Sequence, residues 1–191
     1  MKENVRLGVI GAGNIAVKHL EALQGVAGAT VVGITSRTRS KAEAMAARFG
    51  IPCVADDLDG LMRETRPDGL LILVSVLAVG PVTRDAMHSG LPLFIEKPSG
   101  LTPTESDELA RLAGELGVRS MVGYNRRYYS VFRQGIEIIR RHGPLMGLLI
   151  EGHERMAAVR AAGRHPAAVL DNWLYANATH TVDLLRFFGG E

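Results

Sequence analysis

Cysteine is almost absent from this sequence, because Cys53 is the single one among 191 residues. A lone cysteine excludes an internal disulfide and favours a reducing compartment. No histidine lies near it in the stretch Ile51-Pro52-Cys53-Val54. We therefore interpret Cys53 as a small buried apolar side chain rather than as a nucleophile.

The sequence also lacks an excess charge and a long hydrophobic run. Its formal net charge is +2, from 22 Lys and Arg against 20 Asp and Glu, and the basic residues form no block. This pattern disfavours nucleic-acid binding. The longest apolar run, residues 69–82, is shorter than the roughly 18 residues of a membrane helix, and residues 5–10 are too few for a signal peptide. We expect a soluble, cytoplasmic protein that binds neither nucleic acid nor membrane.

Metal-binding patterns, internal repeats and low-complexity tracts are lacking as well. His142, His153 and His165 are scattered and do not have the spacing of a ligand set. We therefore expect no metal site. The composition, with 47% hydrophobic and 22% charged residues, is that of an ordinary globular protein.

What the first 124 residues do contain is an alternation of apolar runs of β type with helical patterns. Such alternation predicts βαβ units and a parallel sheet. The run Leu70-Leu71-Ile72-Leu73-Val74 is apolar throughout, which is typical of a strand covered on both faces. The expected strands are residues 5–10, 30–35, 53–54, 70–74, 93–96 and 120–124.

Two groups of apolar residues in this part have the spacing i, i+3, i+4, i+7 of a helix: Ala42, Met45, Ala46 and Phe49, and Leu109, Leu112, Ala113 and Leu116. Gly50 and Gly117 follow these groups and are expected to end the two helices. Thr102 is the expected N-cap of the second helix, with Pro103 as its first residue and Glu105 completing a capping box.

After Tyr124 the pattern changes. Residues 131–141 and 179–188 have helical spacing, residues 145–153 are a strand candidate, and residues 155–172 are expected to form loop or irregular helix. A chain of 191 residues has room for one full core and the beginning of a second. We therefore predict an α/β fold, with a doubly wound parallel sheet in residues 1–124 and a partial second domain in residues 125–191.

A glycine motif, Gly11-x-Gly13-x-x-Ala16, follows the first expected strand and opens a helix. Gly11 allows a tight turn, Gly13 lets a pyrophosphate approach the backbone, and Ala16 is small enough for close helix packing. This context predicts a dinucleotide held by Gly11, Gly13, Asn14 and Ile15. The alternative is a glycine turn that binds no ligand.

The stretch Thr35-Ser36-Arg37-Thr38-Arg39 after the second strand contains no carboxylate to meet a free ribose 2′-hydroxyl. A hydroxyl followed by an arginine, here Ser36 and Arg37, instead suits a 2′-phosphate. We therefore favour NADP over NAD. The alternative is that Arg37 and Arg39 only cap and solvate the next helix.

Glu96-Lys97-Pro98 lies just after an expected strand, at the edge where open α/β sheets bind ligands. A lysine there can hydrogen-bond a substrate hydroxyl and favour its alkoxide-like form during hydride loss. Glu96 can hold the ammonium group in place. A surface ion pair is the alternative.

The segments GAGNIA, SRT and Phe94-Ile95-Glu96-Lys97-Pro98 resemble the Gfo/Idh/MocA family of oxidoreductases, and the resemblance extends over residues 5–191. Members of that family are NAD(P)-dependent enzymes that oxidise or reduce sugars, cyclitols and sugar derivatives. Each has a Rossmann domain followed by an α+β domain with a large open sheet. The resemblance therefore implies an NAD(P)-dependent oxidoreductase with a small polyol or sugar as substrate.

The resemblance also implies roles for individual residues. Lys97 is the catalytic-site lysine, and His180, in the segment His180-Thr181-Val182-Asp183, is the proton acceptor. Further residues implied to lie beside cofactor or substrate are Ser75, Tyr124, Arg126 and Asp183.

The chain departs from the family pattern in two places. Many members have an aspartate where Ala176 stands, next to Asn177, and Asp171 replaces it only if the loop shifts. The loop after the fourth strand reads Ser75-Val76-Leu77-Ala78-Val79, whereas the family often has Thr-Pro followed by His. Both departures bear on the reaction rather than on pyrophosphate binding.

The expected second domain holds one strand candidate, which is too few for the family's open sheet. A lone strand leaves an apolar edge exposed, and such an edge favours pairing. We therefore expect an incomplete α+β domain: either the sequence is a truncated product or fragment, or a partner chain or a homo-oligomer completes the sheet. The alternative function is a non-catalytic dinucleotide-binding module.

Overall fold

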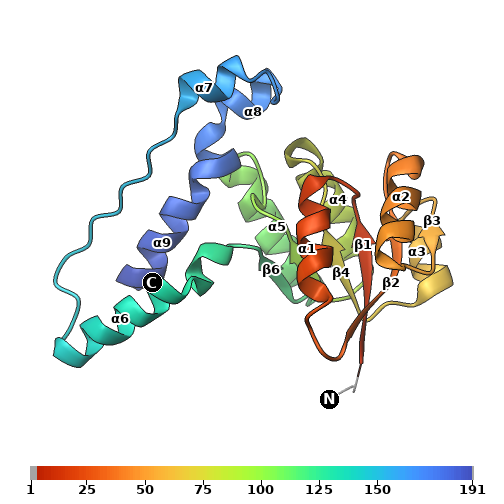
Figure 1. Cartoon of the computed structure of the whole chain (residues 1–191), viewed down its shortest axis with the longest axis horizontal. Helices are drawn as coiled ribbons and strands as arrows, with labels where there is room; N and C mark the ends of the chain where they lie inside the picture. The colour runs from red at the N-terminus through yellow and green to blue at the C-terminus, as the bar shows by residue number, and fades with distance from the viewer. Residues whose placement is uncertain (1–3, 191) are drawn as a thin grey trace. The chain divides into compact units, whose positions relative to one another are not determined.

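The computed structural model describes residues 4–190 and divides the chain into two compact units, with the division between Val122 and Gly123. The division lies two residues before the expected domain boundary. Figure 1 shows the elements of both units.

The first unit contains a six-stranded sheet in which every paired strand is parallel to its neighbour (Figure 1). The strand order is β3-β2-β1-β4-β5-β6, which is the order of a Rossmann-type doubly wound sheet. The prediction of this fold class is therefore confirmed. The elements are β1 (Val5–Ile10), α1 (Asn14–Leu23), β2 (Ala29–Thr35), α2 (Arg39–Phe49), β3 (Val54–Ala55), α3 (Leu58–Thr65), β4 (Gly69–Ile72), α4 (Val76–Met87), β5 (Leu93–Ile95), α5 (Pro103–Leu116) and β6 (Ser120–Val122).

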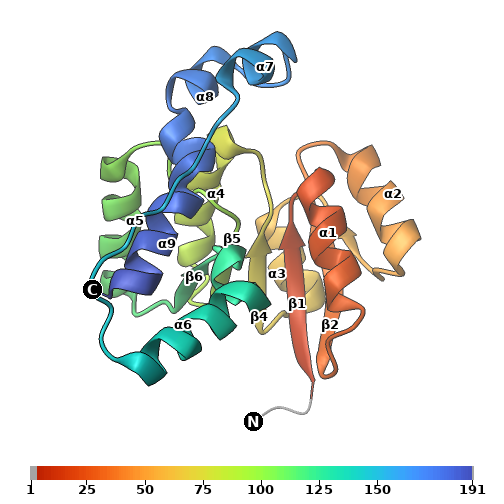
Figure 2. The same cartoon turned by 60° about the vertical axis from the view of Figure 1, so that its left-hand side comes forward.

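Helices cover both faces of this sheet (Figure 2). One apolar cluster joins α1 and α2 to the face of the sheet that carries Val9, Ile34 and Leu71. The other joins α3, α4 and α5 to the opposite face, which carries Leu70 and Ile72. The whole of β4 is buried, as its unbroken apolar sequence predicts. Full burial of one such aliphatic side chain contributes about 1.5–3 kcal/mol.

The ends of two helices follow the sequence signals. Gly50 after α2 and Gly117 after α5 adopt left-handed φ angles of 68° and 65°, as expected for helix-ending glycines. At the start of α5, the Thr102 hydroxyl accepts a hydrogen bond from the Glu105 amide at 3.1 Å. The Glu105 carboxylate accepts from the amide of Leu101 at 2.6 Å, one residue before the partner of a standard capping box.

The second unit is made of helices. They are a 3₁₀ turn (η1, Asn125–Tyr128), α6 (Ser130–His142), α7 (Met156–Ala161), α8 (Ala167–Asp171), a π-helical turn (η2, Leu174–Ala178) and α9 (Thr179–Gly189). The two expected helices of this region are therefore confirmed as α6 and α9. The segment expected as loop or irregular helix contains the short helices α7 and α8.

The strand expected at residues 145–153 is wrong. This segment is extended, but within residues 4–190 its backbone groups form no ladder with another strand. The apolar side chains of residues 145–150 suit a strand, yet a strand exists only where a neighbour takes its hydrogen bonds. The described part of the second unit offers no such neighbour.

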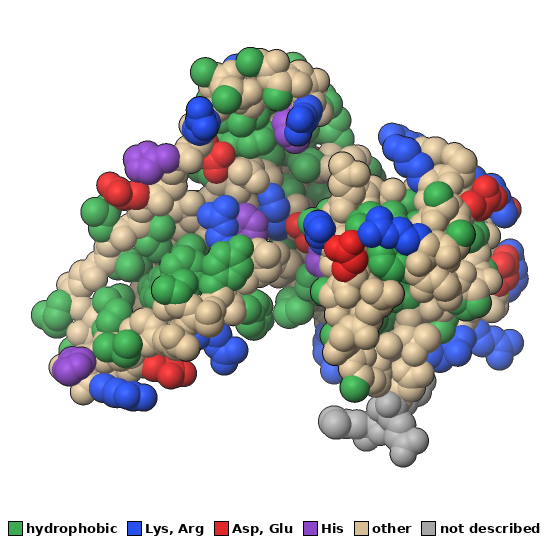
Figure 3. Space-filling model, in the orientation of Figure 1, with side chains coloured by type: hydrophobic (Ala, Val, Ile, Leu, Met, Phe, Trp, Pro, Cys, Tyr) green, Lys and Arg blue, Asp and Glu red, His purple; other side chains and the backbone are tan. Residues whose placement is uncertain are grey.

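Hydrophobic side chains gather on the surface of the second unit (Figure 3). Met146, Leu149 and Val131 are 90%, 83% and 66% exposed. The extended segment, α6 and α9 border an apolar groove of about 670 Å³. Within the described residues, no helix is long and apolar enough to cross a membrane.

Candidate cofactor and active site

The nine residues expected to bind the cofactor follow the carboxyl ends of four neighbouring parallel strands. In the order β2, β1, β4 and β5 they are Ser36 and Arg37; Gly11, Gly13, Asn14 and Ile15; Ser75; and Glu96 and Lys97. The structure therefore places them along one edge of the first unit's sheet. Successive strands are added outward in one direction from β1 to β3 and in the other direction from β4 to β6, so the strand order reverses between β1 and β4, which is where open α/β sheets bind ligands.

Gly11 is required by the fold itself. Its φ of +112° suits glycine, and a Cβ at this position would lie 2.3 Å from the carbonyl oxygen of Leu73. Its amide donates to the Thr35 carbonyl at 2.8 Å. Gly11 thus carries the chain from β1 across the neighbouring backbone, as the motif predicts.

Gly13 is not required by any neighbouring protein atom. A Cβ there would meet nothing within 4 Å, and its φ of −86° is open to every residue. Gly13, Asn14 and Ile15 are exposed at the start of α1, which has no side-chain cap and no acidic residue in its first turn. Free amides and open space at a helix N-terminus fit a pyrophosphate. Ala16, by contrast, is fully buried against the sheet, as expected.

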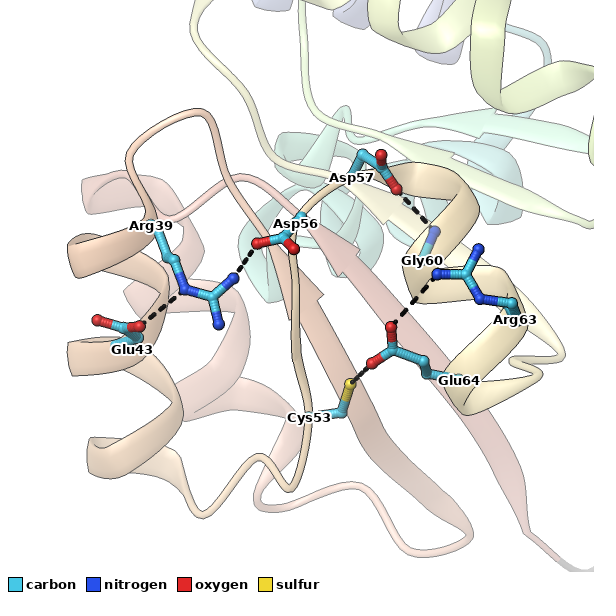
Figure 4. Close-up of polar contacts among 8 residues, drawn as sticks. All are labelled: Arg39, Glu43, Cys53, Asp56, Asp57, Gly60, Arg63 and Glu64. Carbon is cyan, nitrogen blue, oxygen red and sulfur yellow. Dashed lines mark hydrogen bonds and ion pairs between the residues drawn. The ribbon is translucent and has the colours of Figure 1, made fainter.

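The two arginines after β2 have different surroundings. Arg39 lies at the start of α2, where its guanidinium forms ion pairs with Glu43 at 2.9 Å and with Asp56 beyond β3 (Figure 4). The hydrogen bond that Arg39 donates to Glu43 and the charge of Asp56 raise the pKa of Arg39. Arg37 is exposed and forms no hydrogen bond or ion pair within the described residues. The alternative of helix solvation therefore fits Arg39, while Arg37 has its charge available.

Cys53 lies near this region and is half-buried rather than buried. Its thiol donates a hydrogen bond to the Glu64 carboxylate at 3.4 Å (Figure 4). Burial first, and then the neighbouring carboxylate, raise the pKa of the Cys53 thiol. A raised pKa disfavours the thiolate, so the structure supports the interpretation of Cys53 as an unreactive side chain.

The start of α4 corrects the picture of a loop at residues 75–79. Ser75 is the exposed N-cap of α4, and Val76 is already its first helical residue. Serine is among the preferred N-cap residues, but the Ser75 hydroxyl forms no cap hydrogen bond with the first turn of α4. Ser75 still follows β4 at the candidate edge.

Glu96 has a partner that the sequence did not reveal. Its carboxylate Oε2 lies 2.9 Å from Nε2 of His19, on α1. The expected role of Glu96, holding the Lys97 ammonium, stays a prediction. The only hint of this contact in the sequence is that His19 is next to Leu20, one of the buried residues of α1. Lys97 itself is half-buried, and the next residue, Pro98, is fully buried.

In the second unit, Tyr124 and His180 lie together. Their rings meet edge to face with centroids 5.9 Å apart, and His180 is 7% exposed. Burial raises the pKa of the Tyr124 hydroxyl. A phenol that stays protonated can donate a hydrogen bond at neutral pH.

Asp183, expected at the substrate, forms an ion pair within the second unit. Its buried carboxylate accepts from Nε of Arg127 at 2.9 and 2.7 Å, and Nη2 of Arg127 lies 2.6 Å away. Two-pronged geometry of this kind is the strong form of an arginine–carboxylate contact. The contact gives Asp183 a structural partner, and Arg127 is a residue that we did not single out from the sequence. Arg126 borders the apolar groove.

The departure from the family pattern at Ala176 lies in η2. Ala176 is buried in this π turn, which leads directly into α9, and π turns are frequent at functional sites. Asn177 and Trp173 both donate to the Glu154 carboxylate, at 3.1 and 2.9 Å. Asp171 lies 3.6 Å from Arg160 and has thus a partner of its own.

The predicted residues therefore form two groups, one in each unit. The first group is the set of nine residues at the sheet edge. The second consists of Tyr124, Arg126, His180 and Asp183 around η1 and α9. Among residues 4–190, no group of three or more His, Cys, Asp or Glu side chains is arranged to hold a metal ion.

The sheet is doubly wound. A glycine turn and a helix without a side-chain cap lie where the strand order reverses. These features define a Rossmann-type nucleotide-binding protein. Residues 5–124 match the oxidoreductase family with an NAD-binding Rossmann fold, GFO_IDH_MocA. The chain belongs to this family. The resemblance inferred from GAGNIA and Glu96-Lys97-Pro98 is thereby confirmed.

Three similar proteins illustrate the relationship. A 4-carboxy-2-hydroxymuconate-6-semialdehyde dehydrogenase from Sphingobium is 24% identical over 98% of this chain and 60% of its own length. An inositol 2-dehydrogenase from Pseudarthrobacter chlorophenolicus is 27% identical over 100% of this chain and 56% of its own length. The structure of myo-inositol 2-dehydrogenase from Lactobacillus plantarum superposes with a TM-score of 0.81 at 22% identity. The match covers 97% of this chain and 56% of that one. The chain thus spans 56–60% of the length of these relatives.

Proposed function

We propose that the protein is an NAD(P)-dependent oxidoreductase that interconverts a hydroxyl and a carbonyl group on a sugar, a cyclitol or a related small molecule. The observation that carries this proposal is the open turn at Gly13, Asn14 and Ile15 on the same sheet edge as Lys97. Membership of the oxidoreductase family supports the reaction class. The names of the inositol dehydrogenases among its relatives support the substrate class.

The proposed roles follow from the chemistry of the side chains. Lys97 donates a hydrogen bond to the reacting oxygen and stabilises the negative charge that develops there. His180 accepts the hydroxyl proton, so that the oxygen forms a carbonyl. When bound, the nicotinamide ring takes up the hydride that leaves the carbon. Tyr124 and Arg126 are proposed to contact the substrate, and we propose the same for Asp183, held by Arg127.

We propose that the first unit is the cofactor domain and the second a substrate and oligomerisation domain. Within the first unit, Gly11, Gly13, Asn14 and Ile15 hold the pyrophosphate, and Ser75, Glu96 and Lys97 border the nicotinamide. NADP is the preferred cofactor and NAD the alternative, because Ser36 and Arg37 offer a hydroxyl and an available charge where a carboxylate is absent.

Cofactor binding is the first test. NADPH and NADH are titrated separately into the full chain, and binding is followed by nicotinamide fluorescence. We expect tighter binding of NADPH, and in Arg37→Ala a loss of that preference by about tenfold, a typical loss for one charged hydrogen-bonding partner. Arg39→Ala is the matched control and leaves the preference unchanged. Binding of neither nucleotide would refute the proposal.

Turnover is the second test. Lys97→Met is expected to lower the reduction of NADP⁺ by a polyol such as myo-inositol by about 10²–10⁴-fold, as for loss of a positioned acid–base group. NADPH affinity remains within about twofold in this variant because the pyrophosphate turn is intact. Equal turnover in Lys97→Met and the unaltered chain would exclude Lys97 from catalysis. Nucleotide binding without turnover of any polyol would favour the non-catalytic module.

A further inference from the structure

The contact between His19 and Glu96 joins two parts of the candidate site that lie 77 residues apart in sequence. His19 belongs to α1, whose first turn is the proposed pyrophosphate site. Glu96 directly precedes Lys97. Nε2 of the imidazole and Oε2 of the carboxylate are 2.9 Å apart, which is the length of a charge-assisted hydrogen bond.

This pair is better shielded than the ordinary ion pairs of the same helix. The side chains of His19 and Glu96 are 25% and 14% exposed, whereas those of Lys18 and Glu21 are 73% and 40% exposed. The His19 ring also packs edge-on against Phe94, with centroids 5.3 Å apart. Solvent screens exposed pairs until they contribute little. The shielded pair is therefore expected to restrain both partners, unlike the exposed one.

Glu96 is held at its backbone as well as at its side chain. Its amide donates to the carbonyl of Ile72, in the neighbouring strand β4, at 2.9 Å. On the other side of Lys97, Pro98 is fully buried. The backbone of Lys97 thus lies between two fixed residues, and the carboxylate of one of them is held by α1.

The helix that carries His19 is itself fixed on the sheet. Ala16 is fully buried and Leu20 is 2% exposed, three residues before and one residue after His19. The same helix begins at Asn14, beside the open position of Gly13. A ligand that orders the first turn of α1 therefore acts on an element that directly holds Glu96.

We propose that His19 is a positioning residue for Lys97, acting through Glu96. A proton on Nε2 is donated to the carboxylate, and this bond fixes the turn of Glu96 and Lys97 against α1. Occupation of the pyrophosphate turn stiffens the Lys97 turn through the same contact. The nature of the ligand in this inference rests on the proposed function, whereas the restraint on Lys97 exists in the ligand-free chain.

The experiment is amide hydrogen exchange in the segment of residues 93–99, followed by mass spectrometry on the full chain. In the ligand-free state, His19→Leu is expected to speed exchange of this segment by about tenfold, the effect of losing one hydrogen bond to a charged group. His19→Gln retains an amide donor and is expected to stay within about twofold of the unaltered chain. Lys18→Gln, next to it on α1, is the matched control and changes nothing.

The second arm adds ADP-ribose, which has the pyrophosphate but no nicotinamide and so offers no ring to the Lys97 turn. We expect it to slow exchange of residues 93–99 in the unaltered chain and in His19→Gln. In His19→Leu that effect is lost, although ADP-ribose affinity changes less than about threefold, because the pyrophosphate turn is untouched. In an active preparation, His19→Leu lowers kcat and leaves the KM for NADPH unchanged.

Equal exchange of the segment in His19→Leu and the unaltered chain would overturn the proposal. Equal acceleration in His19→Leu and His19→Gln would overturn it too, because ring packing rather than the hydrogen bond would then be responsible. If His19→Leu does not fold, as judged by circular dichroism, Glu96→Ala takes its place, and unchanged exchange in its flanking residues refutes the restraint. Failure of ADP-ribose to bind the unaltered chain would contradict the proposed pyrophosphate site and the stiffening of the Lys97 turn by a ligand there, whereas the ligand-free comparison still decides whether His19 restrains Lys97.

Discussion

The two units of this chain differ in whether their extended apolar segments form backbone hydrogen bonds with neighbouring strands. In the first unit, β4 has parallel partners on both sides and helices over both faces. In the second, residues 145–150 are also mostly apolar, but the segment 145–153 has no strand beside it within the described residues. Similar sequence character thus produces a core strand in one place and an exposed extended segment in the other. The difference lies in the neighbours, since a strand is stabilised by its partners.

The buried side chains show the same contrast. Two apolar clusters fill the space on either side of the first unit's sheet. The buried hydrophobic residues of the second unit are Ile136, Val169, Ala176 and Leu184. Two further buried residues of the second unit are polar: His180 and Asp183, both on α9, and Asp183 pairs with the half-buried Arg127. We therefore expect the second unit to have the lower local stability, because fewer apolar contacts oppose its opening.

The largest expected effect compares the two apolar segments directly. Amides of residues 145–153 are expected to exchange at least about a thousandfold faster than those of β4, since exchange in a core strand requires global unfolding. Hydrogen exchange with mass spectrometry measures both segments in one sample. Comparable protection in the two segments would remove the contrast. Protection of residues 145–153 that increases with protein concentration would indicate pairing with a second copy.

The next effect separates the two glycines of the first unit's motif. Gly11→Ala is expected to destabilise the first unit by more than about 4 kcal/mol, because its Cβ would collide with the Leu73 carbonyl. Gly13→Ala is the matched control, with stability within about 0.5 kcal/mol but weakened NADPH binding. Urea unfolding and fluorescence titration measure the two properties. Equal stability of the two variants would show that Gly11 is not required by the fold.

A smaller effect is expected from the half-buried charge pair of the second unit. Asp183→Asn removes the charge that faces Arg127, whose side chain is 37% exposed, and is expected to cost about 2 kcal/mol, as for the loss of a hydrogen bond between charged groups. Hydrogen exchange should locate this loss in α9 and η1 while β4 keeps its protection. Asp171→Asn, in an exposed pair with Arg160, is the control with little effect. Equal loss of protection in β4 would show that the two units unfold together.

The smallest effect concerns Cys53 in the first unit. Burial and the Glu64 carboxylate raise its pKa, so less thiolate is present at every pH below that value. Alkylation by iodoacetamide at pH 8 is expected to be about tenfold slower than for free cysteine. Glu64→Gln removes one cause of the shift and should accelerate the reaction, while Glu43→Gln should not. A rate equal to that of free cysteine would show that the thiol is not protected.

The sequence was sufficient to predict the elements whose formation depends on local signals. The strands of the first unit lie within two residues of their expected bounds, because their apolar runs are flanked by glycine turns and capped helices such as α5. The strand at residues 145–153 was wrong because a local pattern contains no information about neighbours. For the same reason, the contacts of His19 with Glu96 and of Arg127 with Asp183 were missed, since they join residues 77 and 56 positions apart. The catalytic and binding roles of the site residues stay predictions.

The ion pairs of Arg39 with Glu43 and Asp56 have a consequence for any redesign of the proposed preference for NADP. Two arginines follow β2, but Glu43 and Asp56 already neutralise one of them. The electrostatic attraction for a phosphate at this end of β2 therefore depends on Arg37. Replacing Arg37 with an acidic residue is expected to turn that attraction into repulsion. An engineer who replaced Arg39 instead would loosen the junction of α2 with the segment after β3 and leave the selectivity as it was.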